Sequence, residues 1–348
     1  MDQPSAIGIF GDVVATDLLR VTHNPADLDK SGWWAVTQTF EGEFTAFEFA
    51  NVNPIGEYDL TKHAIPFIEV SDWVPSISQS EYESAVEQIR SEISQGWVYQ
   101  VNLCYVLSAQ LSKTFDPIGL WRLLQTHNPA PYLSALYVPK SESKLTADVA
   151  ITSASPELFL SRDGNQLTSS PIKGTGKNSG DLLEKDRAEN VMIVDLIRND
   201  LSRIAIPGSV TVPELLRTEA HPGLVHLVSD VSGLISDEVS WEEILNSMSP
   251  PGSVSGAPKS SALDVITRLE PTPRAIYCGA FGYVDSNLKI AKLAVGIRTF
   301  WQTQKDNQCY LHFGTGAGIT WGSSPAREWE ETQLKARNLL KIASRRKS

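Results

Sequence analysis

Long apolar runs are missing from this 348-residue chain, and none approaches the roughly 20 residues of a membrane-spanning helix. The first residues, Met1-Asp2-Gln3-Pro4, lack the positive and apolar segments of a signal peptide. Cysteine is scarce as well: the three cysteines lie far apart and form no CxxC pair, which argues against a disulfide framework and against a zinc site. We therefore expect a soluble protein of the reducing cytoplasm.

Positive charge is also in short supply, because the formal net charge is −11 and the one basic run is the terminal Arg345-Arg346-Lys347. This acidity argues against nucleic acid as the main partner. Hydrophobic residues make up 41% of the chain and charged residues 20%, which is typical of a globular protein. An acidic protein that binds an anionic substrate must gather its few cations locally or recruit a metal ion.

Helical and strand patterns alternate without a regular βαβ rhythm. Spacing and capping signals predict helices over 80–96, 182–204, 240–248 and 257–269, and helix starts at Asp116-Pro117, Ser155-Pro156 and Ser324-Pro325. Alternation and apolar runs predict strands over 97–107, 132–138, 149–153 and 166–170, and a strand-rich region over 278–321. Residues 1–79 predict strands and loops that join a main unit over 80–345. No linker separates them, so we expect one integrated α+β unit.

The strand predicted over 97–107 alternates strictly. Trp97, Tyr99 and every second residue onward form the face expected to be buried, which turns Gln100 and Asn102 toward a polar environment.

The most informative stretch is Pro171-Ile172-Lys173-Gly174-Thr175, which follows a predicted short strand. Gly174 can adopt backbone angles that other residues avoid, so a Gly-Thr backbone can hold an anion beside the Lys173 amine. An isolated lysine in such a loop is more often an ordinary surface residue. The other polar residues of this chain favour the functional interpretation.

Two acidic pairs share a helical spacing. Asp186 and Glu189 lie on one face of a predicted helix, with Glu189 on the stripe that should point inward, and Glu328 and Glu331 repeat the pattern in the last helix. Each pair alone is typical of a solvated helix face. An inward carboxylate needs a cation, and Mg²⁺ takes few carboxylates and keeps waters, so together the pairs predict a magnesium site.

Four further features have both a functional and a structural interpretation. The Gly316-Ala317-Gly318 turn lets backbone N–H groups approach a ligand or forms a tight strand crossing. Arg298 offers a guanidinium to a carboxylate or forms a surface ion pair. His226 acts as an acid or base or is a core histidine, and Glu157 is a functional carboxyl or a helix cap. A nucleotide phosphate loop over 252–260 is excluded, because the second glycine does not directly precede the lysine.

Taken together, these residues resemble the chorismate-utilising enzymes, the family of anthranilate synthase component I, aminodeoxychorismate synthase component I, and the isochorismate and salicylate synthases. The matching segments follow the family's order: 155–157, 171–175, 186–190, 195–200, 226–229, 252–259, 279–283, 296–299, 316–318 and 328–337. The resemblance covers about residues 80–345. It implies an α+β fold of two orthogonally packed antiparallel β-sheets with helices outside and the active site in the cleft.

The resemblance also implies residue roles. Glu189 and Glu331 match direct magnesium ligands, and Asp186 and Glu328 match positions that reach the metal through water. Glu157 matches the general acid that protonates the departing 4-hydroxyl, and His226 a histidine beside the ring. The positions that hold the substrate's carboxylates are Gly174, Thr175, Tyr283, Arg298, Gly316, Ala317, Gly318 and Lys335.

Two positions select the branch of the family. Enzymes that add water to C2 carry a lysine where this chain has Gln100, so isochorismate and salicylate chemistry is disfavoured. Anthranilate synthases place alanine at Lys173, whereas aminodeoxychorismate synthases have lysine there. A neutral amine is a good nucleophile, and burial beside other cations lowers a lysine pKa. The resemblance therefore implies attack of Lys173 on C2 of chorismate, followed by ammonia at C4.

The expected product is 4-amino-4-deoxychorismate, the precursor of para-aminobenzoate in folate biosynthesis. The expected cofactor is Mg²⁺, and a separate glutamine amidotransferase subunit would supply ammonia, because no cysteine of this chain stands in a nucleophile-elbow setting. An anthranilate synthase component I with an unusual lysine is the nearest alternative. A non-catalytic chorismate-binding scaffold is the other.

Overall fold

The chain was analysed as a computed structural model, which describes residues 5–63, 73–112, 115–176, 180, 184–221 and 224–344. The terminal basic run therefore lies outside the described residues. The α-helices of the described residues are α1 Gln79–Ser94, α2 Pro117–His127, α3 Lys140–Ser143, α4 Glu184–Ser202, α5 Trp241–Met248, α6 Lys259–Leu269 and α7 Pro325–Ala343.

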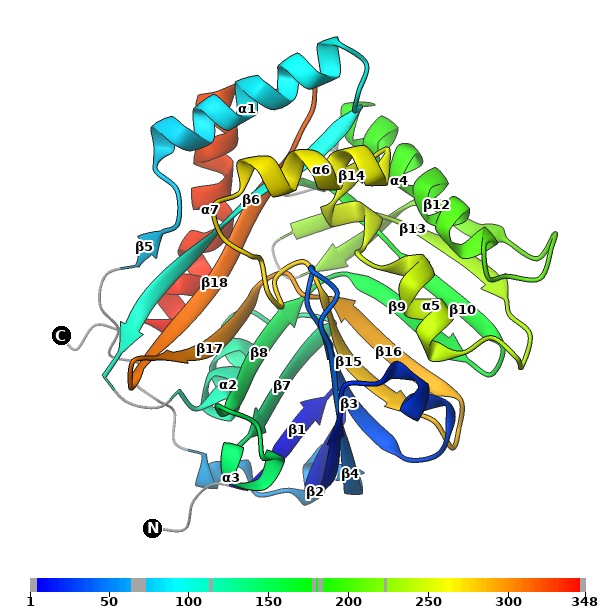
Figure 1. Cartoon of the computed structure of the whole chain (residues 1–348), viewed down its shortest axis with the longest axis vertical. Helices are drawn as coiled ribbons and strands as arrows, with labels where there is room; N and C mark the ends of the chain where they lie inside the picture. The colour runs from blue at the N-terminus through cyan, green and yellow to red at the C-terminus, as the bar shows by residue number, and fades with distance from the viewer. Residues whose placement is uncertain are drawn as a thin grey trace.

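The strands form one network of antiparallel pairings, and the helices lie around it (Figure 1). They are β1 Ile7–Phe10, β2 Val13–Thr22, β3 Trp33–Gln38, β4 Phe44–Pro54, β5 Val74–Pro75, β6 Gln100–Leu111, β7 Tyr132–Val138, β8 Val149–Ser155, β9 Leu158–Asp163, β10 Gln166–Ser170, β11 Ile172–Gly176, β12 Thr211–His221, β13 Leu224–Leu234, β14 Gly256–Ala257, β15 Ala280–Asp285, β16 Ile290–Val295, β17 Thr299–Lys305 and β18 Gln308–Ile319.

Two hydrophobic clusters stabilise this network. One gathers around Trp34, Phe281 and Trp241, and the other around Tyr82, Trp121 and Phe313, with each of these side chains at most 2% exposed. Burial of so many large apolar side chains is the main favourable contribution to folding. The expected α+β fold class, with antiparallel β-sheets and helices outside, is confirmed. Strand pairing links all the described strands into one continuous network.

The N-terminal strands belong to the same network as the rest. β1 pairs with β7, and β3 pairs with both β4 and β15, which is more than two hundred residues further along the chain. Figure 1 shows β1 to β4 beside β7, β15 and β16. Residues 5–54 thus contribute strands to the sheets that carry the polar residues described below.

Two local predictions around α1 and β6 were wrong. The helix predicted over 80–96 begins at Gln79 instead of Ser80: Ser78 and Glu81 form the capping box, whereas the sequence pattern predicts one at Ser80 and Glu83, and the Ser78 side chain accepts the Glu81 N–H. Trp97 and Tyr99 are 62% and 68% exposed, and β6 begins only at Gln100. From Gln100 to Leu107 both faces of β6 are buried, so its alternation did not separate a dry face from a polar one.

Two predicted helix starts were also misplaced. Ser155-Pro156-Glu157 connects β8 to β9 and caps no helix, because the Ser155 hydroxyl accepts the Glu157 N–H in a tight turn. Helix α6 begins at Lys259, since Ala257 pairs with Gln100 in the short strand β14. Among the helices described, none combines the length and apolar character needed to cross a bilayer.

Candidate active site

Lys173 and Glu157 meet at Ser253. The Lys173 Nζ donates to the carbonyl oxygen of Ser253 at 2.8 Å, and the Ser253 side chain hydrogen bonds to the Glu157 carboxyl group. The backbone N–H of Ile172, next to Lys173, also bonds to that carboxyl group. Glu157 is only 4% exposed. An amine and an acid are thus held in one buried place by a residue that touches both.

Burial shifts the proton affinities of this pair in opposite directions. It raises the pKa of Glu157 to about 7, although Ser253, Lys173 and Ile172 partly offset the effect. Burial also lowers the pKa of Lys173, with Glu157 and Glu189 opposing the shift and Lys335 reinforcing it. Both shifts favour the uncharged forms. The shifts of this coupled pair thus act toward a carboxylic acid beside an uncharged amine.

The segment that carries Ser253 is anchored from two sides. Lys259 forms an ion pair with Asp200 of α4 at 2.5 Å, and both side chains are largely buried. Arg274, which is 1% exposed, donates to the Val254 carbonyl at 2.8 Å, to the Asn102 carbonyl at 2.7 Å, and to Glu270. These charge-assisted bonds hold the turn next to β6 and α4. They set the position of the atoms that Lys173 and Glu157 contact.

Arg298 is a cation for which the described part of the chain supplies no ion-pair partner. It lies between β16 and β17 with φ at 53°, a backbone conformation that few residues other than glycine adopt. Burial lowers its pKa, and among the described residues its side chain forms no ion pair or hydrogen bond. Its carbonyl accepts Ala154 N–H at 3.0 Å, and nearby the Val295 N–H bonds to the Glu157 carbonyl. The predicted strand position was therefore wrong, but the geometry suits a bound anion.

The acidic pairs of α4 and α7 lie near enough for charges on one helix to affect pKa values on the other. Glu189 of α4 is partly buried, and burial raises its pKa, with Glu328 of α7 among the charges that add to the rise. Burial likewise raises the pKa of Glu328. Burial acts in the same direction on Glu331, but Lys335, which pairs with it at 2.8 Å, and Lys185 outweigh it and lower its pKa. The inward position predicted for Glu189 agrees with the structure.

These carboxylates fit a magnesium ion in donor chemistry. Asp186 lies one turn before Glu189 on α4, and carboxylate oxygens are ligands that Mg²⁺ prefers. Within the described residues, no three or more acidic, histidine or cysteine side chains converge closely enough to form a metal cage. Mg²⁺ needs no such cage, because it commonly takes one or two carboxylates and completes its shell with water and an anionic ligand.

The Gly316-Ala317-Gly318 segment lies on β18 and faces β6 closely. A Cβ atom at Gly318 would approach the Gln100 Nε2 to 2.3 Å, and one at Gly316 would approach the Cys104 Sγ to 2.5 Å. The Lys335 Nζ donates to the Gly316 carbonyl at 3.2 Å. Gln100 is 2% exposed, and among the described residues its Oε1 has no hydrogen-bond partner. Close packing is thus one reason for these glycines.

The remaining predicted residues divide into two groups. Gly174 has φ at 82°, as its glycine predicts, and Thr175 pairs in register with the buried His226 across β11 and β13, although the Thr175 side chain lies outside the described part. Tyr283 lies elsewhere: its ring stacks on Trp33 at 5.4 Å. No described contact joins Tyr283 to Lys173 or Glu157.

Sequence reasoning gave no role to Ser253, Arg274 or Asn190. Asn190 of α4 donates to the Leu227 carbonyl at 3.2 Å and accepts the Ser229 hydroxyl at 2.5 Å, which joins α4 to the strand of His226. The signal for Ser253 was its segment, which matched the resemblance over 252–259. Asn190 likewise lies in a matching segment, 186–190, whereas Arg274 lies in none, and its buried position leaves no pattern that a single sequence reveals.

Known proteins are similar to this chain in sequence. Anthranilate synthase component 1 of Thermus thermophilus is 38% identical over 276 residues, which cover 76% of this chain and 56% of that protein. Aminodeoxychorismate synthase component 1 of Escherichia coli (strain K12) is 34% identical over 355 residues, covering 97% and 70%. The match to anthranilate synthase component 1 of Aquifex aeolicus covers 55% of its length, so this chain spans little more than half of several relatives.

Solved structures show the same fold. Anthranilate synthase component I from Streptococcus pneumoniae TIGR4 superposes with a TM-score of 0.77 at 24% identity, covering 97% of this chain and 93% of that one. The menaquinone-specific isochorismate synthase MenF from Escherichia coli superposes with a TM-score of 0.77 at 17% identity, covering 98% and 89%. The sequence also matches the family described as chorismate binding enzyme over residues 39–341. With that match added to the relatives above, the chain belongs to the chorismate binding enzyme family.

Proposed function

We propose that this protein aminates chorismate at C4 to give 4-amino-4-deoxychorismate, the reaction that leads to para-aminobenzoate. The observation that carries the proposal is the meeting of Lys173 and Glu157 at Ser253. Amination through a covalent intermediate requires a free amine and a protonated acid at the same place. Gln100, which cannot act as a base at neutral pH, argues against addition of water to C2.

The proposed steps conserve charge and protons. The Lys173 amine forms a bond to C2, the ring double bonds shift, and the C4–O bond breaks as Glu157 gives its proton to the departing hydroxyl, which leaves as water. Ammonia then bonds to C4, the double bonds return, and the C2–N bond breaks to release the Lys173 amine. The proton lost by the new ammonium group returns to Glu157. Both residues end the cycle in the form in which they began.

Chorismate carries two carboxylates, and the site offers matching cations. Arg298 is partly buried and has no protein partner among the described residues, so a substrate carboxylate would satisfy its charge. Beyond Phe313, β18 pairs with β6 and leaves its other edge without a strand among the described residues, so backbone N–H groups near Ala317 are available there. Lys335 lies against the same segment.

Magnesium is part of the proposal. Glu189 and Glu331 would hold the ion, with Asp186 and Glu328 bound through water. When bound, Mg²⁺ would neutralise and orient the substrate's ring carboxylate. Burial is the main cause of the raised pKa values of Glu189 and Glu328, and neighbouring carboxylates add to it, so a bound cation would stabilise their charged forms.

The proposal also includes a partner subunit that supplies ammonia. The three relatives compared above are each named component 1, and we infer that ammonia reaches this chain from a glutamine amidotransferase. Free ammonium salts replace such a partner in a test of this chain alone.

Product identity tests the function directly. The protein is incubated with chorismate, Mg²⁺ and ammonium, and an aminodeoxychorismate lyase is added to half of each reaction. Chromatography should show para-aminobenzoate only after lyase addition. Anthranilate formed without the lyase would identify an anthranilate synthase instead, and isochorismate formed without ammonium would identify the hydration branch.

Loss of one carboxylate should weaken magnesium binding. Glu189→Gln is expected to raise the Kd for Mg²⁺ by at least about tenfold, because an amide oxygen carries no charge to offset the ion. Titration calorimetry with MgCl₂ in the presence of chorismate measures the change. Glu330→Gln, an exposed neighbour of Glu331 on α7, is the matched control and should bind Mg²⁺ normally. Equal Mg²⁺ affinity in all three proteins would remove Glu189 from the metal site.

A further inference from the structure

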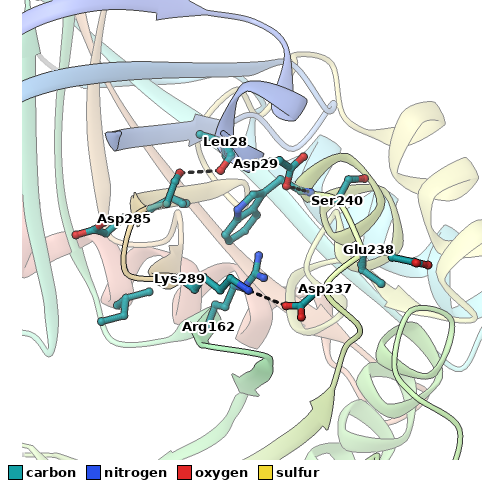
Figure 2. Close-up of a pocket in the computed structure, with 13 residues that line it drawn as sticks. Leu28, Asp29, Arg162, Asp237, Glu238, Ser240, Asp285 and Lys289 are labelled. Carbon is teal, nitrogen blue, oxygen red and sulfur yellow. Dashed lines mark hydrogen bonds and ion pairs between the residues drawn. The ribbon is translucent and has the colours of Figure 1, made fainter. Parts of the chain in front are cut away.

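A cavity of about 230 Å³ lies beside the start of α5, and Lys173 is not among the residues that line it (Figure 2). The residues that line it come from the 3₁₀ helix η1 Pro25–Asp29, the strand β9, the start of α5 and the β15–β16 hairpin. The volume exceeds the roughly 150 Å³ of a cavity that holds benzene, and it is below the range of about 300–1,000 Å³ typical of drug-sized ligands. A molecule of amino-acid size therefore fits.

A buried cation points into this cavity. Arg162 of β9 is 8% exposed. Figure 2 shows its guanidinium group directed toward the centre of the cavity, with Asp29 above it in this view. Its Nε donates to the Gly164 carbonyl at 2.9 Å, and its guanidinium carbon lies 5.7 Å from the ring centroid of Trp241. Within the described part of the chain, no carboxylate forms an ion pair with Arg162. Two guanidinium nitrogens thus remain for a ligand.

Carboxylates also line this cavity. One oxygen of Asp29 accepts the Trp241 N–H at 2.9 Å and holds the start of α5, while the charge of the group faces the cavity. Asp237 pairs with Lys289 at 2.6 Å, and Figure 2 shows this pair beside Arg162. Both Asp29 and Asp237 act on the Arg162 charge without touching it. The cavity therefore combines one buried cation, Arg162, with carboxylates nearer its opening, of which Asp237 is already paired with Lys289.

We propose that this cavity binds a small zwitterion of the α-amino-acid class. The ligand's carboxylate would bind the Arg162 guanidinium group, and its ammonium group would bind Asp29 on the rim. A guanidinium fork matches a carboxylate geometrically, and a single buried cation with separated carboxylates selects a ligand that carries both charges. The face of Trp241 would contact its carbon atoms. This site is independent of the proposed reaction at Lys173.

Calorimetry with the full chain tests the site. Each of the twenty proteinogenic amino acids is titrated separately, with acetate and methylammonium as probes that carry one charge each. At least one amino acid should bind with a Kd below about 1 mM, and neither single-charge probe should bind comparably. Failure of all twenty would overturn the proposal. Acetate binding as tightly as the amino acid would also overturn it, since no ammonium group would then be needed.

Substitutions locate the binding. Arg162→Met keeps most of the buried side-chain volume and should raise the Kd of the amino acid by at least about tenfold. Asp29→Asn keeps the oxygen that accepts Trp241 N–H but removes the charge, so it provides a folded variant even if Arg162→Met unfolds. Arg198→Met, which removes an exposed guanidinium on α4, is the matched control. Amino-acid binding unchanged in Asp29→Asn and in folded Arg162→Met would place the ligand elsewhere and refute the assignment.

Discussion

Lys173→Met is expected to reduce the turnover of chorismate with ammonium by at least about 10³-fold, because it removes the proposed nucleophile while keeping an unbranched side chain. The Km for chorismate should change far less, since Arg298 and the Gly316–Gly318 segment remain. Steady-state rates at saturating chorismate, Mg²⁺ and ammonium, with the lyase coupled, measure the effect. Mass spectrometry of wild-type protein quenched in the absence of ammonium should detect an adduct that the variant lacks.

A second lysine substitution serves as the control for the loss of the Lys173 amine. Lys305→Met removes an exposed lysine at the end of β17 and should leave the rate unchanged. If Lys173→Met kept amination at C4 within a factor of ten of wild type, the covalent route would be excluded. The binding site could then still hold chorismate, and ammonia would have to attack C4 directly.

Glu157→Gln is expected to lower kcat by about 10²- to 10⁴-fold, the usual contribution of a general acid. In the wild type the pKa of Glu157 is raised to about 7 by burial, and the proposed acid must be protonated to act. Activity at saturating substrate should therefore fall as the pH rises through about 7. The variant should lose that falling limb, which a pH–rate profile from 5.5 to 8.5 would show. Glu43→Gln, an exposed site between β3 and β4, is the control.

The same carboxyl group links stability to pH. Its folded pKa lies above the ordinary value of 4.5, so the folded state holds its proton more tightly than the unfolded chain does. The stabilisation from Glu157 is thus fully present below pH 4.5 and is lost as the pH rises toward about 7. Glu157→Gln should show a weaker decline of unfolding free energy over this window. A decline identical to the wild type would mean that Glu157 has no raised pKa.

Local patterns in the sequence predicted regular elements better than irregular ones. Helices α2, α5 and α7 begin where their proline or serine signals place them, because capping depends on neighbouring residues only. Glu157 was misplaced at a helix start because Ser-Pro-Glu satisfies the same local rules in a turn between two strands. For Trp97 and Tyr99, alternation indicates a strand but does not reveal where its burial begins.

The chemistry of the site was predictable in part. The Lys173 stretch was singled out from the sequence itself, and a family resemblance supplied the roles of Lys173 and Glu157. The structure brings the two side chains together through contacts between residues that lie far apart in the sequence. Ser253 could not be assigned, since its role depends on which side chains the fold places against its carbonyl and hydroxyl. The cavity at Arg162 was missed for the same reason: four separate segments line it, and none carries a motif.

Strand β9 connects the candidate active site to the cavity at Arg162. β9 carries Arg162 near its end, and Glu157 directly precedes its first residue, Leu158. Binding and ionisation are linked thermodynamically. If a ligand of Arg162 binds with different affinity to the two ionisation states of Glu157, its binding must shift the pKa of Glu157 by the same free energy. Its dissociation constant would then vary with acidity near neutrality, even though the molecule itself does not titrate there.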